Sequence, residues 1–109
     1  MFWVYILHCE DGSHYTGMTD DVKKRIHTHY HRLKNCAKYT RSHKVDGLCA
    51  LWLCDCESAA RKLEFRIKKL TKEKKLLLIN EPERVSEFFP ALSEYSCSPV
   101  TDIKFEDCI

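Results

Sequence analysis

The sequence predicts an α/β (α+β) domain in which a three-stranded antiparallel sheet is flanked by helices. Phe2 to Cys9 is rich in aromatic and branched residues, and an Asp-Gly turn leads from it into a second short strand, as in a β-hairpin. Gly47 to Cys54 is an apolar run too short for a helix of its own, so it suits a third strand. Elsewhere the apolar residues recur at the spacing of amphipathic helices.

The loop of the hairpin decides where its two tyrosines lie. A two-residue loop would place Tyr5 and Tyr15 on opposite faces, because side chains alternate along a strand. A three-residue loop, Glu10 to Gly12, with Gly12 left-handed in a bulge, instead pairs Tyr5 with Gly17. We predict this second arrangement, in which both phenols share one face and Gly17 leaves open space beside Tyr5.

A basic helix is predicted after the hairpin, with Asp20 or Asp21 as its N-cap. Its apolar positions are Val22, Ile26, Tyr30 and Leu33. Arg25, His29 and Arg32 form a second stripe at the edge of the apolar one. A guanidinium at such an edge is held by packing and still presents its donors to a phosphate, although a single arginine on an amphipathic helix is by itself typical of a solvated surface.

A second helix is predicted after the third strand, starting at Asp55 or Ser58. Its buried stripe is Ala60, Leu63, Ile67 and Leu70. Glu64 lies at the edge of this stripe. One carboxylate is enough to recruit Mg²⁺, which keeps most of its waters and takes further ligands from a substrate phosphate. The alternative is an intrahelical ion pair between Glu64 and Lys68.

Five short motifs occur in one order along the chain. They are Val-Tyr-Ile around Tyr5, Tyr-Thr-Gly from Tyr15, Arg25 with His29 four residues later, Lys38-Tyr39-Thr40, and Glu64 on a helix. This order resembles the GIY-YIG nucleases, in particular their small stand-alone members, over residues 2–79. Similar domains make the incision in bacterial nucleotide-excision repair and resolve branched DNA at junctions. Trp3 replaces the first glycine of the family name, but the reactive side chains are kept.

The resemblance implies a metal-dependent endonuclease that hydrolyses DNA phosphodiester bonds, in repair, recombination or the processing of branched DNA. Its cofactor would be Mg²⁺, with Mn²⁺ as a substitute. The matching catalytic residues are Tyr5, Tyr15, Arg25 and Glu64, and Glu64 is also the metal ligand. The residues expected to contact substrate are His29, Arg32, Lys38, Tyr39 and Arg41. Asn80 either takes the place of the family's late asparagine or ends a helix.

The alternative function is a nucleic-acid-binding or protein-interaction module that keeps this fold and does not cut. Retention of all four catalytic candidates counts against that alternative. The discriminating observation is cleavage of a panel of branched, nicked and single-stranded DNAs in the presence of either metal.

Charge divides the chain into a basic body and an acidic tail. Residues 1–80 carry a net charge of +7 and residues 81–109 carry −5, which together give the overall +2. The body favours phosphate backbones and hence DNA as partner. We therefore predict a GIY-YIG-like nuclease domain over 1–80 and an acidic C-terminal extension over 81–109.

Two helices are predicted around the junction of body and tail. Thr71 can cap a helix that runs through Ile79, and Pro82 can start a short one that Pro90 ends. Beyond Pro90 the pattern is lost. A solvated tail is expected there, with a flap on the body, a competitor of DNA or a contact for a protein partner as alternatives.

The seven cysteines are expected to be free thiols. Their number is odd, and Cys54-x-Cys56 has the wrong spacing for a zinc knuckle. The sequence shows neither a signal peptide nor a long apolar span, so we expect a cytoplasmic protein without a membrane contact, in which thiols stay reduced.

Overall fold

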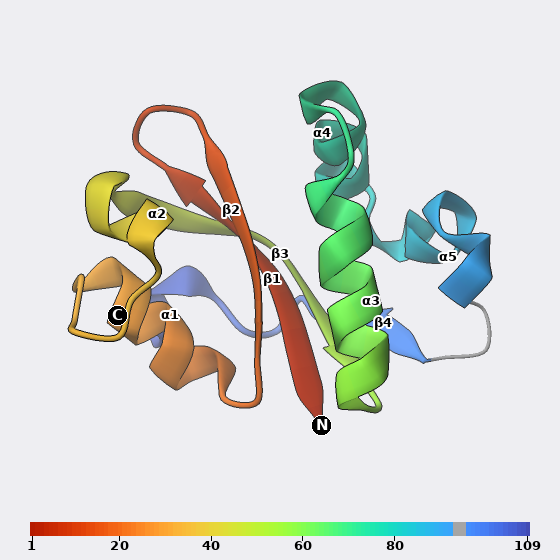
Figure 1. Ribbon diagram of the computed structural model, residues 1–109, viewed down its shortest axis with the longest axis horizontal. Coiled ribbons are helices and arrows are strands. Elements are labelled where there is room, and N and C mark those ends of the chain that lie inside the picture. Colours follow the sequence, from red (N-terminus) through yellow and green to blue (C-terminus); the bar gives the residue numbers. More distant parts are fainter. Residues whose placement is uncertain (93–95) are drawn as a thin grey trace.

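An antiparallel sheet forms the centre of the computed structural model, which describes residues 1–92 and 96–109 (Figure 1). Its strands lie in the order β2 (His14–Thr19), β1 (Phe2–Cys9), β3 (Val45–Cys54) and β4 (Cys97–Pro99). The α+β class and the three predicted strands are confirmed. The prediction of only three strands is wrong, because β4, which has three residues, comes from the tail and pairs with the end of β3.

The hairpin has the predicted three-residue loop. Tyr5 is paired with Gly17, and the Cys9 amide donates a hydrogen bond to the Ser13 carbonyl oxygen at 2.9 Å. Gly12 has a φ of +85°, the left-handed conformation that glycine adopts without the steric cost of a Cβ. The hydrogen bonds of the turn therefore select the register that places Tyr5 and Tyr15 on one face.

One face of the sheet carries α1 (Val22–Tyr30) and α2 (Lys38–Ser42). Asp21 caps α1, because its carboxylate accepts a hydrogen bond from the Lys24 amide at 3.2 Å. The prediction that Leu33 belongs to the buried apolar side of this helix is wrong. Its side chain is exposed, because α1 ends at Tyr30 and Arg32 turns the chain away with a positive φ of 51°.

The opposite face carries α3 (Glu57–Lys68) and α4 (Lys72–Asn80), followed by η1 (Pro82–Arg84) and α5 (Val85–Phe88) (Figure 1). Cys56, between the two predicted starts, is the N-cap of α3. Thr71 caps α4 as predicted. The core under these helices contains Val4, Ile6, Trp52, Ala60, Leu63, Ile67 and Leu78.

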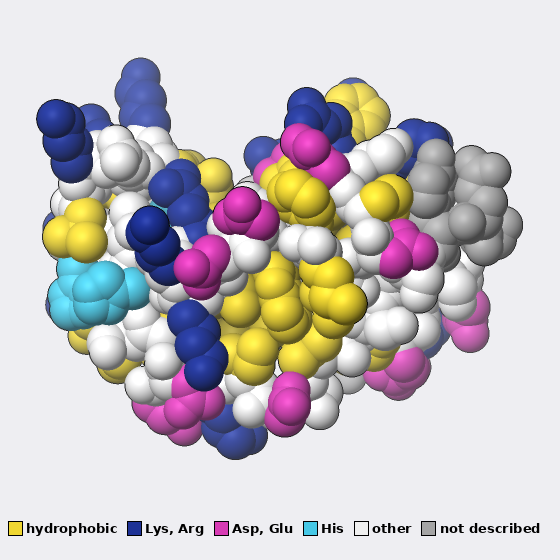
Figure 2. Space-filling view, turned by 90° about the horizontal axis from the view of Figure 1, so that it is seen from below, with side chains coloured by type: hydrophobic (Ala, Val, Ile, Leu, Met, Phe, Trp, Pro, Cys, Tyr) yellow, Lys and Arg dark blue, Asp and Glu magenta, His cyan; other side chains and the backbone are white. Residues whose placement is uncertain are grey.

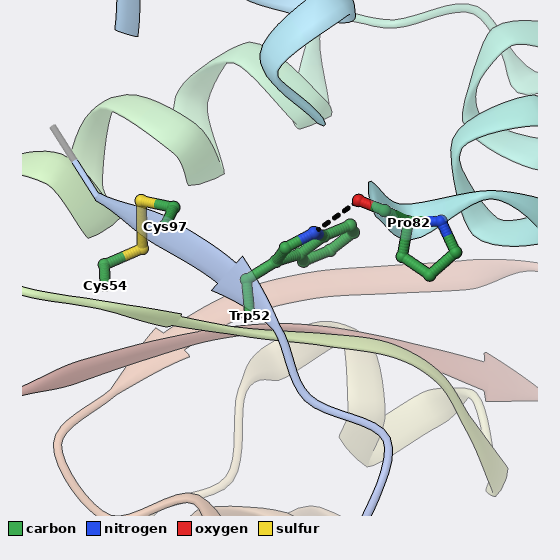
Figure 3. The surroundings of a disulfide bond; sticks show 4 residues. All are labelled: Trp52, Cys54, Pro82 and Cys97. Carbon is green, nitrogen blue, oxygen red and sulfur yellow. Dashed lines mark hydrogen bonds between the residues drawn. A yellow bond between two sulfur atoms is a disulfide. The ribbon is translucent and has the colours of Figure 1, made fainter. Parts of the chain in front are cut away.

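The tail is joined to the sheet by a disulfide. Cys97 in β4 bonds to Cys54 at the end of β3, and nearby the Trp52 indole N–H donates a hydrogen bond to the Pro82 carbonyl oxygen at 3.0 Å (Figure 3). The expectation of free thiols is therefore wrong for Cys54 and Cys97. The chain separation of 43 residues is the reason that no local cysteine spacing revealed the pair. The other cysteines are free.

The expectation of a solvated tail is also wrong. The Val100 amide continues the contact with β3 by donating a hydrogen bond to the Leu51 carbonyl oxygen at 2.9 Å. Ile103 and Phe105, which begins η3 (Phe105–Asp107), pack against the core on the α1 side, and Cys108 is buried there. η2 (Pro90–Leu92) precedes the undescribed residues. A role of this segment in binding a protein partner stays a prediction.

The helices of the described part of the chain are too short or too polar to cross a lipid bilayer.

Candidate active site

The predicted catalytic residues come from two strands and from helices on both sides of the sheet. Tyr5 lies in β1 and Tyr15 in β2, with their ring centroids 6.4 Å apart. Arg25 comes from α1 and Glu64 from α3. Arg25 and Glu64 are close enough to act electrostatically on both phenols. The positive charge of Arg25 lowers the pKa of Tyr5 and of Tyr15, and the negative charge of Glu64 raises both. The fold thus brings all four candidates together.

A chain of hydrogen bonds runs inward from Tyr5. The Tyr5 hydroxyl lies 2.8 Å from His29 Nε2, and His29 Nδ1 lies 2.7 Å from the Thr40 hydroxyl. Thr40 donates its only proton to the Ala37 carbonyl oxygen, so it must accept from His29 Nδ1–H. His29 Nε2 is then the acceptor for the Tyr5 proton. The network therefore presents a proton acceptor to the back of the Tyr5 phenol.

His29 was expected to contact substrate, and this expectation is wrong. The side chain is fully buried, and both ring nitrogens are engaged by Tyr5 and Thr40. Burial, helped by the positive charge of Arg25, lowers the pKa of His29 to about 4. The imidazole is therefore neutral near pH 7 and holds Tyr5 in place. Thr40 has the same kind of positioning role, and its only sequence signal was the Lys38-Tyr39-Thr40 motif.

Buried His29 should make the fold sensitive to mild acid. Its pKa falls from the ordinary 6.5 to about 4 on folding, so the unfolded chain binds more protons between these values. The contribution of His29 to the free energy of unfolding is therefore fully present above about pH 6.5 and is lost as the pH falls toward 4. We expect the free energy of unfolding in urea to be about 2 kcal/mol lower at pH 5 than at pH 7.5.

Two variants assign this pH dependence to its source. His29→Gln should flatten the loss between pH 7.5 and 5, whereas His27→Gln, on the exposed side of the same helix, should retain it. An unchanged pH dependence in His29→Gln, or NMR titration of the parent His29 ring near pH 6.5, would contradict the neutral buried state.

Tyr5 is a neutral phenol in the resting site. Burial raises its pKa well above the ordinary value, and the neighbouring Tyr15 adds to the rise, while Arg25 opposes it. Burial also raises the pKa of Tyr15, again against the effect of Arg25. Ionisation of Tyr5 therefore needs more positive charge than Arg25 supplies.

Gly17 provides the space that Tyr5 occupies, as predicted. A Cβ at this position would lie 2.5 Å from the Tyr5 hydroxyl oxygen and 3.1 Å from a Tyr15 ring carbon. Tyr5 is held by the core and by His29, so it cannot move away freely. We expect Gly17→Ala to lower the free energy of unfolding by about 1–3 kcal/mol, measured in urea.

Gly47→Ala is the matched control for this change. Gly47 also lies in a strand, but a Cβ there would meet only the His8 Cβ at 3.6 Å, an ordinary contact. The effect of glycine on the unfolded chain is common to both variants. Equal stability of the two variants would show that the space beside Tyr5 is not required.

Glu64 has the setting of a ligand for a largely hydrated cation. Its side chain is 21% exposed, and one carboxylate oxygen lies 3.6 Å from Lys68 Nζ, which is 5.9 Å from the centre of the Tyr15 ring. The described residues contain no group of three or more His, Cys, Asp or Glu side chains that could hold a metal. A single carboxylate fits Mg²⁺, which takes its other ligands from water and phosphate, and does not fit a structural zinc.

The predicted substrate contacts other than His29 lie on or near the surface. Arg32, Lys38 and Arg41 are exposed, and Tyr39 is half-buried between Tyr15, at 5.9 Å between ring centroids, and His43, at 3.9 Å. Asn80 is exposed at the last residue of α4 and takes no part in the hydrogen-bonded network. Of these side chains, Tyr39 is the one whose contact with a catalytic candidate, Tyr15, is defined within the described residues.

The loop between α1 and α2 is held by two arginines, Arg25 and Arg41. Arg25 donates a hydrogen bond to the Asn35 carbonyl oxygen at 2.7 Å, and Arg41 donates one to the Lys34 carbonyl oxygen at 3.4 Å. Arg25 is half-buried and keeps further N–H donors. The contact with Asn35 therefore orients the guanidinium.

The surface between the two halves of the molecule is hollowed and carries charges of both signs. Figure 2 shows a hollow between the half of the molecule that contains α1 and α2 and the half that contains α3, with Lys and Arg side chains on both sides and Asp and Glu side chains among them.

Comparison with known proteins identifies the family. The GIY-YIG catalytic domain model matches residues 1–76. A UPF0213 protein of Fusobacterium nucleatum is 45% identical over 82 residues, covering 75% of this chain and 80% of that protein. One of Halalkalibacterium halodurans is 41% identical over 78 residues, covering 72% and 81%. The solution NMR structure of a UPF0213 protein from Bacillus halodurans shares 40% identity over 73% of this chain and 84% of its own, with a TM-score of 0.47. On the domain match and these identities, the chain belongs to the GIY-YIG nuclease family.

Proposed function

We propose that this protein is a metal-dependent endonuclease that hydrolyses DNA phosphodiester bonds. The observation that supports it most is the directed hydrogen-bond chain from Tyr5 through His29 to Thr40, which begins beside Arg25 and Glu64. A binding module has no need of a buried proton acceptor behind a phenol. The combination is the one expected for general base catalysis at a phosphate.

Tyr5 and His29 together move the proton of the attacking water in this proposal. The water gives a proton to the Tyr5 oxygen while the original Tyr5 proton passes to His29 Nε2, 2.8 Å away. The water oxygen then bonds to phosphorus and the bond to the leaving oxygen breaks. The leaving oxygen keeps the electron pair of that bond and takes a proton from solvent, while His29 gives its extra proton back through Tyr5. Tyr5 and His29 are both neutral at rest, so together they can take up the proton that the water loses. Positive charge beside the water and the phosphate favours loss of that proton, although it opposes the positive charge that forms on His29.

Arg25 and Glu64 assist this step in different ways. Arg25 presents N–H donors to the phosphate oxygens, where negative charge develops. Glu64 would hold Mg²⁺ or Mn²⁺, which stabilises charge on the phosphate and the leaving oxygen when bound. Tyr15, which packs against the rings of Tyr5 and His29, would position the water or the phosphate.

Cleavage of defined DNAs tests the proposal. Purified protein is incubated with labelled flap, junction, nicked, single-stranded and duplex DNAs of one sequence, with Mg²⁺, Mn²⁺ or EDTA. We expect metal-dependent strand scission, and preference for flaps or junctions would support a role in repair or recombination. An absence of cleavage of every DNA with both metals would contradict the nuclease and leave the binding module.

A further inference from the structure

A second basic site lies beside the hairpin loop, away from the catalytic candidates. A cavity of about 180 Å³ separates this loop from the first turns of α4. It is lined by Ser13 and His14 on one side and by Lys72 and Lys75 on the other. All four residues can donate hydrogen bonds or carry positive charge, and none is a carboxylate.

Lys75 lies on the side of α4 that packs against the body. Leu78 and Ile79, three and four residues later, are buried and half-buried on this side, and Lys75 itself is half-buried. Residues at these spacings share one helix face. Lys72, three residues before Lys75, joins it at the cavity. The sequence thus places a lysine at a packing position, where an apolar residue is the ordinary choice.

Lys75 and His14 both lie in positive surroundings. Burial and then Lys68 lower the pKa of Lys75. Burial lowers the pKa of His14, and His8, Lys75 and Lys72 add to the effect. Within residues 1–92 and 96–109, the ion pairs include none with Lys72 or Lys75. An anion between these groups would relieve their repulsion.

The cavity and the candidate active site are reached from the same edge of the sheet. His14 and Tyr15 are neighbours in β2, the edge strand, and their side chains point to opposite faces. Lys68 links the two regions, since its ammonium lies over the Tyr15 ring and its charge acts on Lys75. A strand that follows the free edge of β2 can therefore contact both.

We propose that the cavity lined by Ser13, His14, Lys72 and Lys75 binds a backbone phosphate of the DNA substrate, displaced along the strand from the phosphate that is cut. The inference rests on the proposed function for the identity of the polyanion. The cavity offers donors for phosphate oxygens, and its only ring is that of His14, so it contacts the backbone and reads no base. Its role is to set the path of the DNA across β2.

The test compares two double variants with the same change in charge. Lys72→Gln/Lys75→Gln removes the two cations of the cavity, and Lys69→Gln/Lys74→Gln removes two exposed lysines of the same region that do not line it. DNA affinity is measured by fluorescence anisotropy in EDTA over a range of salt concentrations. The readout is binding, so it remains interpretable whether or not the protein cuts.

We expect the cavity variant to bind DNA about 10-fold more weakly, with a slope of log affinity against log salt that is smaller by about 1, as for one lost phosphate contact. The control pair should lose about twofold or less in DNA affinity and keep the parent's slope of log affinity against log salt. Equal losses in the two pairs would show that only overall charge matters and would overturn the proposal.

A second measurement distinguishes a DNA phosphate from a free one. The His14 ring resonances are followed by NMR while the parent protein is titrated with inorganic phosphate or with a short DNA strand. We expect saturation by DNA at a far lower concentration than by inorganic phosphate, and loss of the DNA response in Lys72→Gln/Lys75→Gln. A response to inorganic phosphate without one to DNA would overturn the assignment.

Discussion

Glu64→Gln is expected to lower the single-turnover rate of DNA cleavage by about 1,000-fold or more, with little change in stability or in DNA affinity. The amide keeps the shape of the side chain but loses the charge that retains Mg²⁺, and with it several kcal/mol of transition-state stabilisation. The lost ion pair with Lys68, 3.6 Å away on the same helix, contributes only a few tenths of a kcal/mol, since the Lys68 side chain is about half exposed. Rates are measured with protein in excess over labelled DNA.

Glu57→Gln is the matched control for this variant. Glu57 lies on the same helix and pairs with Arg61, also four residues later, at 2.6 Å. The Glu57→Gln variant should cut DNA at the parent rate, because Glu57 is not among the residues of the candidate active site. Manganese binding, followed by electron paramagnetic resonance, should weaken in Glu64→Gln and not in Glu57→Gln. Undiminished cutting by folded Glu64→Gln protein would mean that the catalytic ion, if any, binds elsewhere.

Arg25→Ala should lower the single-turnover rate by about 100-fold or more while DNA affinity changes only a few-fold. A large effect on the rate with a small effect on affinity is expected for a contact that strengthens as charge develops on the phosphate. Arg25→Lys should restore little of the rate, since an ammonium is a point charge and cannot reproduce the two-pronged contact of a guanidinium. Lys23→Ala, an exposed change on the same helix, should weaken binding modestly and reduce its salt dependence.

The outcome for Arg25 separates catalysis from binding. Arg25 also holds the Asn35 carbonyl oxygen, so the stability of Arg25→Ala is measured beside its rate. If the variant is folded and behaves like Lys23→Ala, with weaker salt-dependent binding and an unchanged rate once bound, the catalytic role is wrong. If it loses rate only in proportion to lost stability, Arg25 acts by holding the loop.

Local features of the chain could be predicted because their causes are local. The Glu10–Gly12 loop sets the register of the hairpin through its own hydrogen bonds and the positive φ of Gly12. Asp21 and Thr71 cap helices by bonding amides three residues away. The shared face of Tyr5 and Tyr15 follows from that register.

The errors of prediction have causes that lie far apart in the chain. β4 has three residues and pairs with a strand more than 40 residues earlier through Cys54 and Cys97. The helical stripe indicated Arg25 and His29 equally, although packing half-buries the first and fully buries the second. A helical wheel gives the direction of a side chain but not what lies there.

The sequence by itself therefore determined the hairpin and its register, the cap of α4, two adjacent candidates for the cap of α1, the family resemblance and the identity of the four catalytic candidates. Only the tertiary structure decided that His29 stands behind Tyr5, that Lys68 joins Glu64 to Tyr15, and that the tail completes the sheet. The physical reason is the range of the forces involved. Hydrogen bonds within a turn or cap act between residues three or four apart, whereas burial and the pairing of distant segments depend on the whole packed chain.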